Sequence, residues 1–204
     1  MPWPKVEPKK FASIRELNGI SQRTMEEHYE LYKGYCGKVN EIQERLNAVD
    51  RGSANQIYSD LRGLRVDLSF AIGGVKNHEL YFAHLGGKGG NPSGRLAELI
   101  NRDFPSYDAW LADFKASGLA ARGWVWLAYD HDLSMLTTVV GDSQNTFPLW
   151  NATPILALDV YEHAYWLDYG RARAKYIDAF FNNLDWSVVE ANLDRALSMQ
   201  PATK

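Results

Sequence analysis

The chain has 204 residues, of which 46% are hydrophobic and 13% aromatic, so it can bury a real core without disulfides. Its formal net charge of −3 includes no basic block, and no stretch approaches the roughly 20 apolar residues of a membrane span. These features argue against nucleic acid or a membrane as the main partner. With one cysteine, Cys36, and no apolar leader in the first thirty residues, a cytoplasmic setting is expected.

The first half of the chain predicts an extended arm and two long helices. Residues 1–18 are rich in proline and lysine, and Ser21 is a candidate N-cap. One apolar stripe then follows a helical spacing of three and four: Met25, His28, Tyr32, Tyr35, Val39, Ile42 and Leu46. A loop near residues 50–53 separates it from a second stripe: Ile57, Leu61, Leu64, Leu68, Ile72, Val75, His78, Phe82 and Leu85. Two such helices form an antiparallel hairpin, so His28 and His78 are expected to face a common point.

Residues 86–92 contain four glycines and a proline, which cannot continue a helix. We expect the boundary here, with the arm and helical hairpin in residues 1–90 and an α/β domain in residues 91–204. Beyond it, helices are predicted over 93–104, 106–117, 171–181 and 186–199, and strands over 124–129, 134–140 and 153–160. The fold class is therefore α+β, with a helical hairpin preceding a small three-stranded sheet.

Asp159 closes the apolar run 154–158, and His163 follows four residues later. An ionised carboxylate at the end of a buried strand costs several kcal/mol unless a cation, a metal or dense hydrogen bonding neutralises it. A single inward histidine is more often a core residue than a ligand. Together, however, His28, His78, Asp159 and His163 offer three imidazoles and one carboxylate, which suits iron, manganese or zinc better than calcium or copper(I).

The segment Asp159–Tyr165, DVYEHAY, resembles the Asp-x-Trp-Glu-His-Ala-Tyr signature of the iron/manganese superoxide dismutases. The resemblance extends over almost the whole chain, through Asn77-His78, through GWVWL at residues 123–127, and through a C-terminal pattern: Arg173, Phe180, Asn183 and Trp186. It implies a three-stranded antiparallel sheet and one iron or manganese ion per subunit. It also implies the metal ligands: His28, His78, Asp159 and His163.

The activity implied by the resemblance is an antioxidant one, the conversion of superoxide to dioxygen and hydrogen peroxide by alternate reduction and oxidation of the metal. Zinc could fill such a site but has no one-electron couple for this reaction. The alternative is a non-catalytic, superoxide-dismutase-like metal-binding protein. A hydrolytic di-metal protein is less favoured, because the carboxylates of Glu27, Glu30 and Glu79 lie off the inward stripes.

The source of one glutamine bears on the choice of metal. Many iron enzymes of the family carry it four residues before the second histidine, where this chain has Gly74, whereas manganese enzymes supply it from the loop between strands. Gln144 lies in that loop, which gives a mild lean to manganese, although a surface glutamine without a role is the competing interpretation. Ala157 fits neither metal's usual pattern, so both metals stay open.

Tyr35 is the expected gateway tyrosine at the mouth of the site, although its spacing from His28 is one residue shorter than the family's usual spacing. Keeping the usual spacing would select Cys36, whose flanking residues match less well. Trp124 is expected to line the metal pocket, with core packing as the simpler interpretation. Arg173 is expected to add positive charge for steering superoxide.

The resemblance further implies a homodimer, with a tetramer as the alternative. Glu162 is expected to reach the partner's His163 across a two-fold axis. Trp166 and Tyr32 replace the family's tyrosine–histidine pair at this contact. Tyr161 replaces the family's tryptophan beside the metal and brings a hydroxyl that needs a partner.

Overall fold

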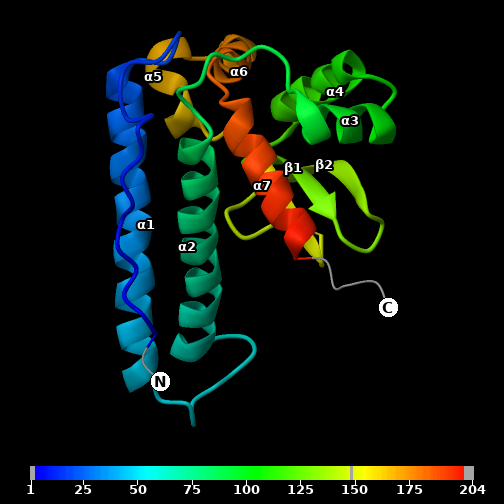
Figure 1. Cartoon of the computed structure of the whole chain (residues 1–204). Helices are drawn as coiled ribbons and strands as arrows, with labels where there is room; N and C mark the ends of the chain where they lie inside the picture. Colours follow the sequence, from blue (N-terminus) through cyan, green and yellow to red (C-terminus); the bar gives the residue numbers. More distant parts are fainter. Residues whose placement is uncertain (1–2, 148, 200–204) are drawn as a thin grey trace.

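The computed structural model describes residues 3–147 and 149–199. Two long helices, α1 (Gln22–Ala48) and α2 (Asp60–Ala83), lie side by side as an antiparallel hairpin (Figure 1). The Ser21 side chain caps α1 by accepting the Thr24 N–H, as the sequence predicts. The buried face of α1 follows the predicted stripe, except that Cys36 is buried and Tyr35 only half-buried.

The second helix begins three residues later than its predicted stripe. Ile57 lies in the loop and is 83% exposed, so its assignment to the apolar face is wrong. The Asn55 side chain accepts the N–H groups of Ile57 and Tyr58 and holds them in a turn, and Ser59 then caps α2. Ile57 precedes Leu61 by four residues and so matches the helical spacing by chance, although it lies outside the helix.

The N-terminal arm runs back along the hairpin beside α1 (Figure 1). The Asn40 side chain holds Val6 at both backbone groups, accepting its N–H at 2.9 Å and donating to its carbonyl at 2.9 Å. Farther along, Tyr29 donates to the Lys9 carbonyl and Tyr32 accepts the Lys9 N–H, each at 2.9 Å. The arm is therefore fastened by side chains of α1.

The rest of the described chain forms an α/β unit. Its elements are α3 (Gly94–Asp103), α4 (Tyr107–Ala120), β1 (Trp124–Asp130), β2 (Met135–Gly141), β3 (Ala152–Asp159), η1 (Glu162–Ala164), α5 (Trp166–Tyr169), α6 (Arg173–Asn182) and α7 (Trp186–Ser198). The strands pair in the order β2-β1-β3, with both pairs antiparallel, so the predicted fold class is confirmed. The short elements η1 and α5 were not predicted, because three or four residues are too few to display a period. The division into domains at residue 90 remains a proposal.

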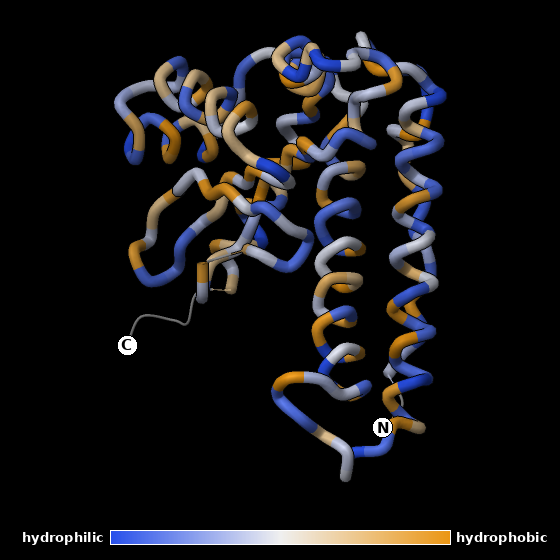
Figure 2. Tube along the Cα trace, turned by 180° about the vertical axis from the view of Figure 1, so that it is seen from behind, coloured by the Kyte–Doolittle hydropathy of each residue, from blue (hydrophilic) through white to orange (hydrophobic). Residues whose placement is uncertain are grey.

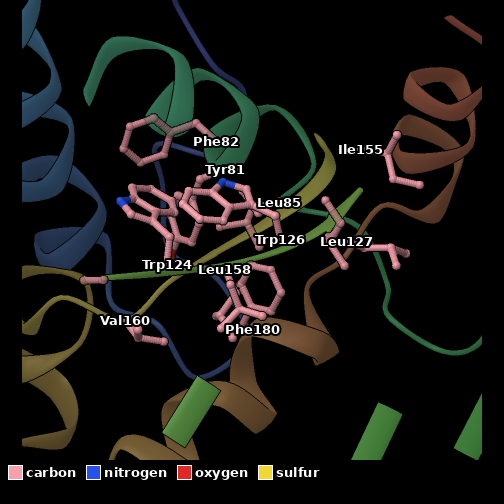
Figure 3. Close-up of a cluster of buried hydrophobic side chains, with 14 of the residues drawn as sticks. Tyr81, Phe82, Leu85, Trp124, Trp126, Leu127, Ile155, Leu158, Val160 and Phe180 are labelled. Atoms are coloured by element: carbon pink, nitrogen blue, oxygen red, sulfur yellow. The ribbon is translucent and has the colours of Figure 1, made fainter. Parts of the chain in front are cut away.

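The central strand β1 is buried along its whole length. The rings of Trp124 and Trp126 stack 6.3 Å apart, and Tyr81 of α2 packs beside Trp124 at 6.4 Å (Figure 3). Phe180 of α6 stacks on Tyr81 at 5.8 Å. The core thus joins the helical hairpin, the sheet and α6, and it places the start of β1 next to α2.

Hydrophilic and hydrophobic residues recur in turn along both long helices, which is the pattern of a helix with one buried and one exposed face (Figure 2). Within residues 3–147 and 149–199, no helix combines the length and the apolar character that crossing a membrane requires.

Candidate metal centre

Four potential metal ligands reach one point from four elements. His28 lies on α1, His78 on α2, Asp159 at the end of β3 and His163 in η1. The Nε2 atoms of His28 and His163 each lie 3.1 Å from Oδ2 of Asp159, and Nε2 of His78 lies 3.5 Å from it. The four ligand atoms all lie within 4.8 Å of one another. Ligands bound to one ion at about 2.0–2.2 Å lie roughly 3–4 Å apart, so the cluster has the size of a coordination shell.

The carboxylate of Asp159 is held by the backbone around it. Pairing of β1 with β3 places Asp159 opposite Trp124, at the edge of the buried sheet. The Tyr161 N–H donates to Oδ1 of Asp159 at 2.9 Å, and this turn starts the short helix that brings His163 back over Oδ2. The Tyr176 hydroxyl donates to the Asp159 carbonyl at 2.7 Å. Oδ2 therefore remains directed at the three imidazoles.

The side chain of His78 shows that a cation fits between these groups. Its Nδ1 lies 2.6 Å from the Gly74 carbonyl, so Nδ1 carries the proton and Nε2 a lone pair. Nε2 is buried without a hydrogen-bond partner among the described residues, and burial lowers the pKa of His78 to about 3. A bare nitrogen lone pair facing a carboxylate oxygen is unfavourable unless a positive charge lies between them. A metal ion would supply that charge.

Asp159 is ionised in this setting. Burial opposes its charge, but the neighbouring rings of His163 and His28 outweigh burial and hold the pKa of Asp159 below its ordinary value. His28, His78 and Asp159 are buried, and only the His163 ring reaches solvent, with 25% of its side chain exposed. The cluster thus brings three imidazole nitrogens and one charged oxygen together, with only the His163 ring open to solvent.

Gln144 lies beside two rings that pack on this cluster, Trp124 and Tyr35. Its side chain is 2% exposed, accepting the Trp124 indole N–H at 3.0 Å and donating to the Tyr35 hydroxyl at 3.3 Å. The Tyr35 ring packs 5.4 Å from the His78 ring. Gln144 therefore links Trp124 to Tyr35 at the edge of the cluster, and the interpretation of Gln144 as a surface residue is wrong.

Gly74 is in contact with the Tyr35 ring. A Cβ atom added to Gly74 would lie 2.6 Å from that ring, closer than real Cβ contacts come. No side chain fits here without displacing Tyr35, so in this chain the glutamine cannot come from position 74. The glutamine that contacts Tyr35 is Gln144, which lies on the loop between β2 and β3.

Comparison with known proteins decides the family. Residues 92–192 match the family model described as iron/manganese superoxide dismutases, C-terminal domain. The chain is 43% identical to superoxide dismutase [Fe] of Aquifex pyrophilus over 206 residues, which covers 98% of this chain and 96% of that protein. The chain belongs to the iron/manganese superoxide dismutase family. It is also 36% identical to superoxide dismutase [Mn] 2 of Halobacterium salinarum over 182 residues, covering 88% of this chain and 90% of that protein.

Tyr161, where this family usually has tryptophan, keeps its ring against the cluster. The ring stacks on His163 with centroids 5.3 Å apart and planes within 16° of parallel. Its hydroxyl donates to the Asp142 carbonyl at 3.3 Å, in the loop that carries Gln144. The hydroxyl therefore has the partner that the sequence required.

The exposed edge of His163 opens into a cavity of about 610 Å³, lined also by Glu162, Arg122 and Arg173. Arg173 is tied down, donating to the Tyr165 hydroxyl at 3.1 Å and to the Ala121 carbonyl at 2.8 Å. The Arg173 charge thus lies beside the cavity, and the side chain also braces the end of α4.

Tyr32 does not lie where the family comparison suggested. It is 0% exposed in the single chain, and its hydroxyl donates to Glu79 at 3.0 Å and accepts the Lys9 N–H. The arm covers it, so Tyr32 offers no surface to a second subunit, and its expected place at a dimer contact is wrong. Trp166, in contrast, is 47% exposed on α5, next to the His163 segment.

Sequence reasoning did not assign a role to Tyr176, Asn77 or His84. Tyr176 supports the Asp159 carbonyl, and Asn77 donates to the Gln144 carbonyl at 3.0 Å. His84 is fully buried away from the cluster and contacts the Ala157 carbonyl at 3.0 Å. The place of Asn77 next to a predicted ligand was a usable signal. Tyr176 lies in an apolar helix pattern and gave none.

Proposed function

We propose that this protein is a superoxide dismutase that converts superoxide to dioxygen and hydrogen peroxide with one iron or manganese ion per chain. The observation that carries the proposal is the convergence of three imidazole Nε2 atoms on one ionised carboxylate oxygen, with the His78 lone pair facing it unpaired. In this proposal the ion is held by His28, His78, Asp159 and His163. Similarity over 98% of the chain to a named superoxide dismutase supports the same function.

A bound iron or manganese ion would supply a one-electron couple, taking an electron from one superoxide and returning it to another. The described residues supply the surroundings. The buried Trp124 ring packs against His78 at 5.3 Å and keeps bulk water away from the cluster. Tyr35 stands at the edge of the cluster with its hydroxyl on Gln144. Reduction of superoxide to hydrogen peroxide consumes two protons. We assign their local delivery to the Tyr35 hydroxyl and the Gln144 amide, the hydrogen-bonded pair at the edge of the site.

The origin of Gln144 in the β2–β3 loop favours manganese, as the sequence suggested. Two named relatives at 43% and 42% identity are iron enzymes, whereas relatives at 36% identity are manganese enzymes. Iron and manganese therefore both stay open for this chain, and the reconstitution experiment below chooses between them. The non-catalytic alternative is not favoured, because the four candidate ligands all converge and two of the altered aromatic residues, Tyr32 and Tyr161, have hydrogen-bond partners inside the chain.

The test is to reconstitute metal-free protein separately with iron, manganese and zinc, and to measure bound metal and superoxide dismutase activity in each sample. We expect activity with iron or manganese and none with zinc, because zinc has no accessible one-electron couple. Stoichiometric binding of all three metals without activity would refute the enzyme and favour the metal-binding alternative.

We also propose that the protein is a cytoplasmic homodimer in which Glu162 contacts the partner's His163. Glu162 is exposed beside the open edge of His163, and Trp166 adds an exposed apolar side chain next to it. Sedimentation of the wild type and of Glu162→Ala measures the oligomeric state of each. We expect a wild-type dimer and weaker dimerisation of the variant; a wild-type monomer at micromolar concentration would contradict the proposal.

A further inference from the structure

One face of α2 is shaped to receive the loop that carries Gln144. Ser69, Gly73 and Asn77 follow one another at single-turn intervals and therefore share that face. The Asn77 side chain donates to the Gln144 carbonyl at 3.0 Å, and Ser69 accepts the Asn145 side-chain amide at 2.7 Å. The middle position is glycine. We name these three α2 residues the docking strip.

Gly73 leaves no spare room in this contact. A Cβ atom added there would lie 2.1 Å from the Gln144 carbonyl oxygen and 2.7 Å from its carbonyl carbon. Both atoms belong to backbone, so they cannot be relieved by turning a side chain. Any residue other than glycine at position 73 would push the loop away from α2.

The neighbouring face of α2 holds Tyr35. Phe70 and His78 flank the Tyr35 ring at 6.0 and 5.4 Å, and Gly74 between them makes room for it. Two adjacent rows of one rigid helix therefore hold the two partners of the Gln144–Tyr35 hydrogen bond. The docking strip fixes the backbone of Gln144. The second row fixes the Tyr35 ring, whose hydroxyl accepts a hydrogen bond from the Gln144 side-chain amide.

Gln144 lies on a loop, whose backbone is more mobile than a helix unless other groups hold it. Its side chain has to meet the Trp124 N–H and the Tyr35 hydroxyl at once. We propose that Ser69, Gly73 and Asn77 are positioning residues for dismutation, which act by docking the Gln144 loop on α2. The inference rests on the proposed function, and it adds the residues that place the glutamine.

The test compares Gly73→Ala with Gly63→Ala in the full-length chain. Both positions lie on α2, so both changes raise helix propensity, but a Cβ atom at Gly63 meets nothing within 4 Å. The first readout is the ¹⁵N–¹H signal of the Trp124 indole in metal-free protein, assigned with Trp124→Phe. We expect this signal to shift and to exchange with solvent faster in Gly73→Ala, and to be unchanged in Gly63→Ala.

The second readout is kcat of manganese- and iron-loaded protein at measured metal content. We expect Gly73→Ala to lower kcat about 10–100-fold, the range typical for residues that orient groups around a metal, with metal content unchanged. Because Gly73 acts through Gln144, adding Gly73→Ala to Gln144→Ala is expected to lower kcat no further. If Gly73→Ala only damaged the fold in general, kcat of the double variant would be lower than kcat of Gln144→Ala alone.

Asn77→Ala is the second variant, which removes the amide that holds the Gln144 carbonyl without adding bulk; it keeps the test open if Gly73→Ala does not fold. We expect the same Trp124 signal change and the same lack of additivity with Gln144→Ala. An unchanged Trp124 signal and unchanged kcat in the folded variants, or effects that add fully to Gln144→Ala, would overturn the inference. If the wild type is inactive with both metals, the proposed function fails, and the Trp124 signal still decides whether the strip docks the loop.

Discussion

Acidification from pH 7 to pH 5 is expected to destabilise this protein by about 2 kcal/mol through His84 alone. His84 is fully buried at the end of α2, with its Nε2 3.0 Å from the Ala157 carbonyl. Its Nδ1 has no hydrogen-bond partner among the described residues. A proton added to Nδ1 would meet neither water nor an acceptor, so burial lowers the pKa of His84 from 6.5 to about 3.

The sign follows from which state binds the proton. In the unfolded chain the His84 ring takes up a proton as the pH falls through 6.5, whereas in the folded chain it stays neutral down to about pH 3. The stabilising contribution is therefore complete above pH 6.5 and is lost as the pH falls below it. From RT ln(1 + 10^(6.5 − pH)), the loss is about 0.2 kcal/mol at pH 7 and about 2 kcal/mol at pH 5.

The assay is urea unfolding of the wild type and His84→Gln at pH 7 and pH 5, at one ionic strength and one metal load. The glutamine amide can still donate to the Ala157 carbonyl but does not titrate, so the difference between the two proteins isolates His84 from the other titrating groups. We expect the wild type to lose about 2 kcal/mol more than the variant between the two pH values. Equal losses would refute the reasoning, because they would mean that the folded protein accepts the proton at His84.

Three further predictions concern the site and the arm. Asp159→Ala is expected to reduce bound iron or manganese from about one ion per chain to nearly none by metal analysis, because the cluster loses its only charge; wild-type metal content would contradict the ligand set. Gly74→Gln is expected to destabilise the fold by about 1–3 kcal/mol in urea unfolding through its clash with the Tyr35 ring, and an unchanged midpoint would disprove that contact. Asn40→Ala removes both hydrogen bonds to Val6 and is expected to cost about 1–3 kcal/mol and to speed tryptic cleavage of the arm; cleavage at the wild-type rate would show that the arm is held elsewhere.

Several features were readable from local sequence. The spacing of large side chains along α1 and α2 predicts which face each helix buries, and it therefore places His28 and His78 toward the interior. The charge of Asp159 after an apolar strand predicts that something positive must meet it. Both inferences depend only on residues close in the chain. The structure buries both histidines and gathers three imidazole rings around the Asp159 carboxylate.

Other features depended on which surfaces meet. The spacing of large side chains predicted that Tyr32 is buried, but not that the arm covers it. A loop sequence alone could not separate the two interpretations of Gln144. The structure separates them because Asn77 and Gln144, 67 residues apart, come into contact on α2. The need for glycine at position 73 likewise exists only once that contact is made.

The sequence by itself determined the helical hairpin, the strands, the family resemblance and the four candidate ligands, because periodicity and residue chemistry are local properties. Only the tertiary structure decided that Gln144 reaches Tyr35, that the arm covers Tyr32, and that Gly73 and Gly74 each make room for a different neighbour. These outcomes depend on close packing between segments far apart in the chain. Packing at that distance is set by the whole fold and not by the spacing within any one element.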